Sequence, residues 1–326
     1  MDFQVGILMD DLETREYLAS QWGKKGTTSD ISLYSVSSKD ITQTTIVPEG
    51  YPKKPLSLII SAHMSDILIL GMPISGVNQN IGEAAILADC MGLPGLILIV
   101  GENTKGMDTY FDQVNKIFSK LEIKNWGNFV VHDGLSSNNV REMIKKLAMK
   151  IERRTEDYLA IEVDHSFPVQ GVGSVILGTI MSGQIKKGDK IKSLPNKQEG
   201  IVRSIQVNDQ DVNEASAGTH VGLAIKGILP KYLERGTVIS TINEEFVYEN
   251  NILKVKLKLS KFEQSIEVGN KIHLICGLFD SPSKIVELGD VVIIETEKMM
   301  PLHPNIRITV LDLNRKPSII GSGYLN

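Results

Sequence analysis

The chain has 326 residues, of which 42% are hydrophobic and 23% are charged, and its formal net charge is -4. This composition is typical of a globular protein of two or three domains, and the negative charge argues against a protein that wraps nucleic acid over its whole surface. The two cysteines show no disulfide or zinc spacing, and the longest apolar run is about half a membrane span, so we expect a cytoplasmic protein with no metal, no membrane contact and no DNA partner.

The first half of the chain alternates short apolar runs with helical patterns. Runs typical of buried strands occupy residues 3–9, 30–36, 44–47, 66–73, 95–102 and 128–133. Helical patterns lie between and after these runs, at residues 12–23, 55–64, 82–92, 107–122 and 137–158. The alternation predicts an α/β domain over residues 1–157, with a doubly wound and mostly parallel sheet.

The helical period disappears after residue 158. From there, glycines separate short alternating runs of Val, Ile and Leu up to the C-terminus. This pattern predicts antiparallel strands, and the length fits two β-barrels, at residues 158–245 and 246–326. A polar segment at residues 243–251 forms the junction between them.

Glycines in the first predicted barrel carry a family resemblance. The matched features include the closing pair Arg235-Gly236 and, earlier in the segment, Gly171, Gly173, Gly178, Gly183, Lys187-Gly188-Asp189, Ala217-Gly218 and Val221-Gly222-Leu223. Together these residues resemble the second domain of translational GTPases such as elongation factor Tu. Residues 254–288 resemble the third domain of SelB, the selenocysteine-tRNA elongation factor. With residues 22–34, the chain is similar to archaeal SelB-like factors proposed to serve pyrrolysine tRNA.

The resemblance extends to the α/β domain, but the GTPase motifs are changed. A phosphate loop reads GxxxxGK followed by Ser or Thr, whereas the stretch from Gly6 places Asp11, Leu12 and Glu13 at the last three positions. The magnesium and γ-phosphate motif DxxG reads Val-Pro-Glu-Gly and ends at Gly50.

The guanine-recognition motif NKxD is also changed. It aligns with Val-Gly-Glu-Asn and ends at Asn103. These positions are therefore interpreted as remnants of a nucleotide site, and we expect no catalytic residue and no cofactor. GTP and Mg²⁺ are the cofactors of the alternative hypothesis, in which substitute residues still bind nucleotide.

Asp10 and Asp11 allow two interpretations. Carboxylates suit Mg²⁺, so both residues are candidate metal ligands. Asp11 also stands directly before a helical pattern, where a helix N-cap is expected, and we favour this interpretation.

Two groups of lysines are candidate RNA ligands. Lys24 and Lys25, between two glycines, form either a mobile cationic loop or a solvated turn. Lys254, Lys256 and Lys258 alternate with apolar residues, which places three positive charges on one face of one strand. A solvated face of an antiparallel strand would show the same pattern.

In the family, the acceptor end of tRNA lies against the second domain, and this implies a contact around Gly171, Val172 and Gly173. The resemblance thus predicts a SelB-like elongation factor paralogue that has lost GTP binding and hydrolysis. It would act by binding tRNA, another RNA, the ribosome or a translation-factor protein. The alternatives are an active GTP-binding factor that delivers a special aminoacyl-tRNA and a regulatory subunit that docks proteins.

Overall fold

The computed structural model describes residues 1–326 except 39–40, 102–106, 132–133, 154–157 and 263–264. It divides into two compact units. The first comprises Met1–Glu152 with Ser260–Phe262, and the second comprises Arg153–Leu259 with Glu263–Asn326. The first unit is an α/β domain and the second contains two β-barrels, which confirms the predicted fold class.

The α/β unit contains a seven-stranded sheet in the order β2-β3-β4-β1-β5-β6-β7. Strands β4, β1, β5, β6 and β7 run parallel, whereas β3 is antiparallel to β4 and β2 is antiparallel to β3. The strand bounds are Asp2–Leu8 for β1, Lys24–Thr28 for β2, Ser32–Ser37 for β3, Thr42–Val47 for β4, Ile67–Pro73 for β5, Gly95–Val100 for β6 and Gly127–Val131 for β7.

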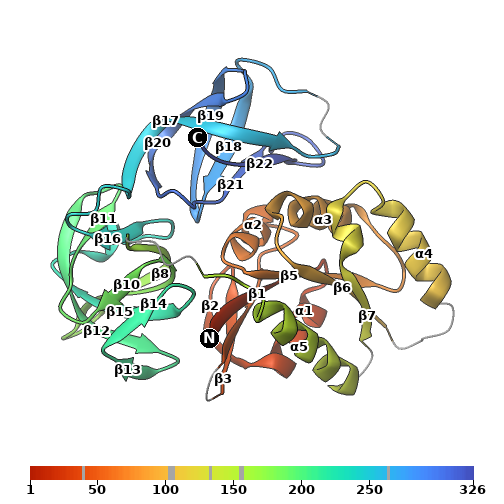
Figure 1. Ribbon diagram of the computed structural model, residues 1–326, viewed down its shortest axis with the longest axis horizontal. Helices are drawn as coiled ribbons and strands as arrows, with labels where there is room; N and C mark the ends of the chain where they lie inside the picture. The colour runs from red at the N-terminus through yellow and green to blue at the C-terminus, as the bar shows by residue number, and fades with distance from the viewer. Residues whose placement is uncertain (39–40, 102–106, 132–133, 154–157, 263–264) are drawn as a thin grey trace. The chain divides into compact units, whose positions relative to one another are not determined.

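Helices cover both faces of this sheet. Figure 1 shows α1 and α5 on one face and α2 and α3 on the other. Apolar side chains of α1, α5 and the strands form a buried core on the α1 side, with Trp22 as its largest member. The helix bounds are Leu12–Trp22 for α1, Pro55–His63 for α2, Gln79–Met91 for α3, Met107–Ile117 for α4 and Gly134–Ala148 for α5, with a short 3-10 turn at Glu122–Asn125.

Helix α5 ends ten residues before the end predicted from the sequence. The prediction placed this helix at residues 137–158, but α5 ends at Ala148. The N–H groups of Lys150 and Ile151 bond to carbonyls three residues earlier, at 3.0 Å each. These bonds tighten the end of the helix, and Ile151 packs against the apolar core without continuing the α-helical ladder.

The second unit contains two closed barrels. The first barrel has the strand order β11-β16-β8-β9-β15-β12 and closes where β12 pairs with β11. Strand β13 pairs with the end of β12, and β10 pairs with β14. Its strand bounds are Ala160–Val169 for β8, Gly173–Ser182 for β9, Gln184–Lys186 for β10, Lys190–Leu194 for β11, Gln198–Val207 for β12, Gln210–Val212 for β13, Glu214–Ser216 for β14, His220–Lys226 for β15 and Val238–Thr241 for β16, with a 3-10 turn at Pro230–Tyr232.

The second barrel closes in the order β17-β20-β19-β18-β21-β22. Inward-facing apolar residues of these strands form its core, as the alternating pattern predicts. Its strand bounds are Tyr248–Leu259 for β17, Lys271–Cys276 for β18, Phe279–Glu287 for β19, Val292–Leu302 for β20, Ile308–Leu311 for β21 and Ile319–Leu325 for β22.

Candidate functional site

Gly6 lies inside strand β1. It pairs with Ile46 of β4 and Leu68 of β5, in the middle of the parallel sheet. A Cβ added to Gly6 would come within 2.4 Å of the hydroxyl oxygen of Ser65, which follows α2, and within 3.2 Å of the carbonyl oxygen of Ser61 in α2. The glycine is therefore required for close packing between the strand and the helix.

Only Met9, Asp10 and Asp11 connect β1 to α1. Asp11 is the N-cap of α1, and its carboxylate accepts a hydrogen bond from the Thr14 main-chain nitrogen at 2.7 Å. Hydrogen bonds from the side chain and main chain of Thr14 lower the pKa of Asp11. The cap interpretation of Asp11 is confirmed, and the following Leu12 and Glu13 form the first turn of α1.

Asp10 connects this turn to the start of α3. Its two carboxylate oxygens accept hydrogen bonds from the side-chain amides of Asn78, at 2.6 Å, and Asn80, at 2.9 Å. Asn78 is itself the N-cap of α3, since its amide oxygen accepts from the Ile81 nitrogen at 2.9 Å. Both oxygens of Asp10 are thus engaged by amide donors.

The Arg15 side chain on α1 is fully buried. Its Nη1 donates to the carbonyl oxygen of Met9, and its Nη2 donates to the carbonyl oxygen of Tyr51 at 2.8 Å. The guanidinium carbon lies 5.9 Å from the centroid of the Tyr51 ring. Burial lowers the pKa of Arg15, while nearby carboxylates, first Glu49 and then Asp11, oppose that shift.

Sequence reasoning missed Arg15, although a signal for it exists. Arg15 precedes Leu18, Ala19 and Trp22 at helical spacings of three, four and seven residues, and all three are buried. An arginine in line with an apolar stripe points to a buried guanidinium that needs acceptors nearby.

Tyr51 and Gly50 are held by main-chain groups. The Tyr51 hydroxyl donates to the carbonyl oxygen of Asn80 at 2.7 Å, and burial raises the pKa of this phenol. The Gly50 N–H donates to the carbonyl oxygen of Asp30 at 3.0 Å. The remaining predicted remnant, Asn103, lies outside the described residues.

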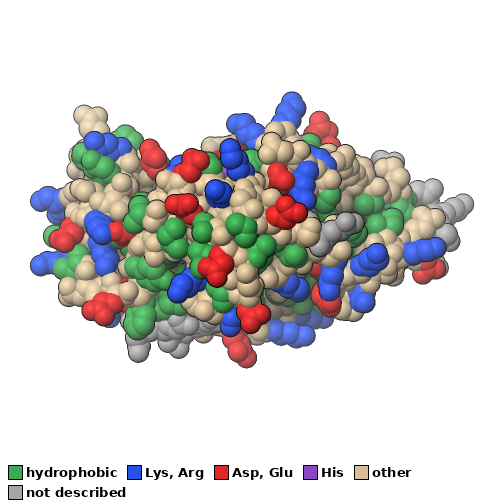
Figure 2. Space-filling model, turned by 90° about the horizontal axis from the view of Figure 1, so that it is seen from above, with side chains coloured by type: hydrophobic (Ala, Val, Ile, Leu, Met, Phe, Trp, Pro, Cys, Tyr) green, Lys and Arg blue, Asp and Glu red, His purple; other side chains and the backbone are tan. Residues whose placement is uncertain are grey.

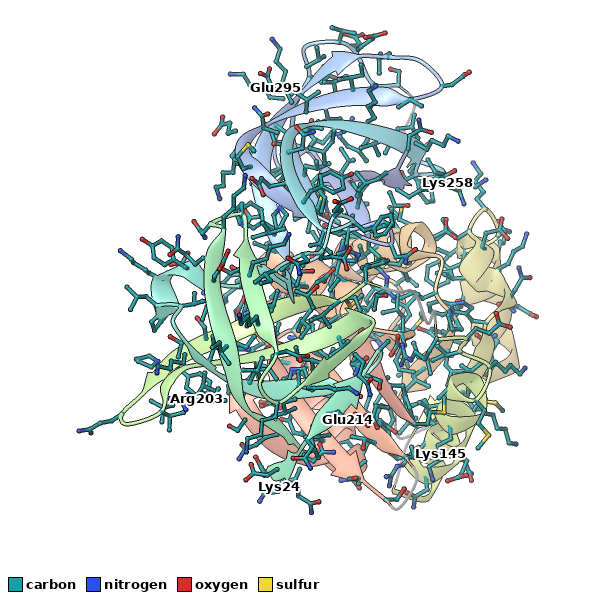
Figure 3. The ribbon with its side chains drawn as sticks, turned by 60° about the vertical axis from the view of Figure 1, so that its left-hand side comes forward. Lys24, Lys145, Arg203, Glu214, Lys258 and Glu295 are labelled. Carbon is teal, nitrogen blue, oxygen red and sulfur yellow. The ribbon has the colours of Figure 1, made fainter. Side chains whose placement is uncertain are left out.

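Lys24 and Lys25 do not lie in a loop, so the expected loop or turn conformation is wrong. Both belong to β2, where Lys24 pairs with Ser35 and Lys25 pairs with Tyr34 of β3. The sequence pattern did not indicate this strand, because edge strands are often polar and charged and lack the apolar alternation of buried strands. Figure 3 labels Lys24, whose side chain is exposed.

Lys25 takes part in a network of charged and aromatic groups. Its ammonium lies 2.5 Å from a carboxylate oxygen of Glu16 and 3.3 Å from one of Glu49. It also lies 5.6 Å from the centroid of the Tyr34 ring. The hydrogen bond with Glu16 is the main cause that raises the pKa of Lys25.

The predicted acceptor-end contact lies at the tip of the β8–β9 hairpin. Gly171 and Gly173 have φ angles of 80° and 116°, which a residue with a side chain adopts only under strain. Between them, the Val172 side chain is 47% exposed, and its N–H donates to the Val169 carbonyl oxygen at 3.1 Å. The hairpin therefore presents an apolar side chain to solvent.

Lys254, Lys256 and Lys258 share the outer face of β17, and Val255 between them is buried. Figure 3 labels Lys258 near one end of this strand. On the face seen in Figure 2, acidic and basic side chains are interspersed, without a broad field of one sign.

Two buried carboxylates in the barrels contact histidines. Glu162 of β8 accepts from Nε2 of His303 at 3.0 Å, and both side chains are buried. Asp164 contacts Nδ1 of His165 at 2.5 Å and Nε2 of His220 at 2.8 Å.

Among the residues that the structure describes, no group of three or more His, Cys, Asp or Glu could hold a metal ion, and no helix is long and apolar enough to cross a membrane.

Comparison with known sequences gives matches over most of the chain. The family model for elongation factor Tu domain 2 matches residues 173–240. The uncharacterized protein MJ0325 of Methanocaldococcus jannaschii is 30% identical over 312 residues, which cover 95% of this chain and 96% of that protein. The selenocysteine-specific elongation factor of the same organism is 28% identical over 276 residues, covering 81% of this chain but only 58% of that protein.

Solved structures share the fold. The translation elongation factor SelB of Methanococcus maripaludis, in complex with the GTP analogue GppNHp, matches with a TM-score of 0.89 at 22% identity, covering 100% of this chain and 79% of that chain. A bacterial selenocysteine-specific elongation factor matches with a TM-score of 0.87 at 19% identity, covering 99% of this chain and 58% of that chain. With MJ0325 matched over nearly its whole length, the chain belongs to the same family as that protein, among the SelB-like and elongation factor Tu-like translation factors.

Proposed function

We propose that this protein is a SelB-like factor that neither binds nor hydrolyses GTP and that acts by binding tRNA or another RNA. The observation that carries the proposal is that the donors at the β1–α1 turn already have acceptors within the protein. Three residues connect β1 to α1. The buried guanidinium of Arg15 donates one hydrogen bond to the main-chain carbonyl of Met9, within this turn, and another to that of Tyr51, in the segment after β4.

A phosphate loop depends on free donors at the start of its helix. It cradles phosphates with successive main-chain N–H groups and a lysine, placed at the start of a helix. Here the Thr14 N–H at the start of α1 already donates to Asp11. Asp11 and Asp10 also place negative charge at this turn, which disfavours an anionic ligand.

The groups that could substitute for the missing contacts have other partners. Arg15 donates to carbonyls, Lys25 lies against Glu16 and Glu49, and the Gly50 N–H donates to Asp30. Loss of one charge-assisted contact costs roughly 1.5 to 3 kcal/mol. A loss of about 3 kcal/mol raises a dissociation constant about a hundredfold.

Isothermal titration with GTP and GDP, each with Mg²⁺ at millimolar ligand, tests the loss of nucleotide binding. We expect no heat of binding from this protein. SelB of Methanococcus maripaludis, which has been crystallised with a GTP analogue, serves as the positive control. Saturable binding at micromolar affinity would contradict the proposal and would support the alternative, an active GTP-binding factor that delivers an aminoacyl-tRNA.

RNA binding is the second part of the proposal. Membership of the elongation-factor family supports tRNA and the ribosome as partners in general. The exposed β8–β9 hairpin tip and the three lysines of β17 supply an apolar contact and positive charge for such a ligand. A filter-binding assay with labelled total tRNA, at low and high salt, tests this part. Protein partners without any RNA in a native purification would instead support a docking subunit.

A further inference from the structure

Tyr324 lies on the same outer barrel surface as the three lysines of β17. In the antiparallel β17–β22 pair, Lys256 stands opposite Tyr324 and Lys258 stands opposite Ser322. The Lys256 ammonium lies 6.0 Å from the centroid of the Tyr324 ring. The tyrosine is 58% exposed, so much of its ring remains free for a further contact.

Strands β17 and β22 place lysines, and no acidic residue, close to this ring. Strand β22 contains no acidic residue, and the only acidic residue of β17 is Glu249, near the opposite end from Lys258. On the neighbouring strand β20, Glu295 stands opposite Ile252, two residues beyond Lys254. Figure 3 labels Glu295 well away from Lys258. An anionic ligand is therefore favoured around Tyr324.

We propose that Tyr324 is a stacking platform for an unpaired nucleotide of the bound RNA, with Lys256 and Lys258 holding the adjacent phosphates. This inference rests on the proposed RNA-binding function and specifies the form of RNA that is recognised. An exposed aromatic ring beside lysines is the combination that single-stranded nucleic acid uses, because every base has a face that can stack. Paired bases inside a duplex have no free face to offer.

The backbone geometry holds the ring and the lysines in register. Strand β17 is hydrogen-bonded on one side to β20 and on the other to β22, within a closed barrel. Alternate residues of a strand are about 6.8 Å apart, so Lys256 and Lys258 project along one line beside the ring. The platform is preformed and needs little ordering on binding.

Fluorescence anisotropy with two labelled RNAs tests the proposal: a 12-nucleotide single strand and a blunt duplex of the same length. Tyr324→Ser should weaken single-strand binding by about fivefold or more and leave duplex binding unchanged. Tyr324→Phe should bind as the wild type does, since the ring is kept. Tyr248→Ser, which changes another exposed tyrosine on β17, is the matched control and should also bind normally.

Salt dependence separates stacking from charge. Tyr324→Ser should shift the single-strand affinity at every salt concentration without changing its slope, because it removes no phosphate contact. Equal losses on single strand and duplex, or no loss on either, would overturn the stacking platform while the RNA-binding function stands. If the wild type binds neither RNA nor tRNA, the proposed function itself fails. Binding of acidic peptides in place of RNA would overturn both the stacking platform and the proposed RNA-binding function.

Discussion

The guanidinium of Arg15 donates to the main-chain carbonyl oxygen of Tyr51 at 2.8 Å, across 36 residues of sequence. A second bond from the same guanidinium reaches Met9 at the end of β1. A helix residue thereby connects the first strand with the segment that follows β4. In GTPases such as Ras, the γ-phosphate and its Mg²⁺ order the switch segments. In this protein, the side chain of Arg15 connects the two segments directly.

Replacement of Arg15 should destabilise the α/β unit. Arg15→Met removes donors from two carbonyl oxygens in a buried region, and we expect the free energy of unfolding to fall by roughly 3 kcal/mol. Urea denaturation followed by tryptophan fluorescence measures this unit selectively, because both tryptophans, Trp22 and Trp126, belong to it. Lys25→Met, which removes a half-exposed ion pair, is the control and should cost no more than about 1 kcal/mol. Equal effects of the two changes would contradict the structural role of Arg15.

Replacement of the β17 lysines should reduce the salt dependence of RNA binding. If Lys254, Lys256 and Lys258 each neutralise one phosphate, the triple alanine variant should lower the slope of log affinity against log salt by about 2 to 3. The matched control replaces Lys145, Lys146 and Lys150, at and just beyond the end of α5, with alanine. Both variants change the net charge by the same amount. An identical slope in the β17 variant would remove its lysines from the interface.

Asp164 should make the stability of the first barrel depend on acid pH. Burial alone would raise the pKa of this carboxyl, but the charge of His220 and hydrogen bonds from His165 and His220 outweigh burial and hold the pKa well below its usual range. A carboxyl whose folded-state pKa is depressed contributes stability above the unfolded pKa of about 4. That contribution is lost as the pH falls from about 4 towards the folded pKa.

Hydrogen exchange of peptides from β8 and β15 in the full chain measures this effect. Asp164→Asn should speed exchange at pH 7, and the difference from the wild type should shrink as the pH falls below about 4. A difference that stays constant down to pH 2 would show that the carboxylate charge does not stabilise the barrel.

The buried pair Glu162 and His303 should stabilise the second unit more than an exposed pair of the same kind. His303→Ala leaves a buried carboxyl without this donor, and we expect a loss of roughly 3 kcal/mol. His273 and Asp280, also 3.0 Å apart but partly exposed, give the comparison, and His273→Ala should cost under about 1 kcal/mol. Protection from hydrogen exchange in β8 and β20 reports both losses, and similar values would contradict the prediction.

Local chemistry explains which features the sequence predicts. The Asp11 cap was predictable because the carboxylate and its partner, Thr14, are three residues apart. The lysine face of β17 was predictable because strand side chains alternate. In contrast, His220 meets Asp164 across 56 residues, and no local pattern indicates that contact. Strand β2 escaped prediction because all five of its residues are polar or glycine.

The short β1–α1 turn has a consequence for the direction in which this chain can change. Where a side chain alone is missing, one substitution can return it. Here the stretch from Gly6 has the full length of the phosphate loop motif, but its last three positions are occupied by Asp11, Leu12 and Glu13. If nucleotide binding has been lost, as proposed, its return would require substitutions at these positions, and replacing Asp11 would also remove the N-cap of α1 that supports the present fold. A variant that lacks this cap and binds no phosphate would be less stable than the present chain, so such a loss would be difficult to reverse.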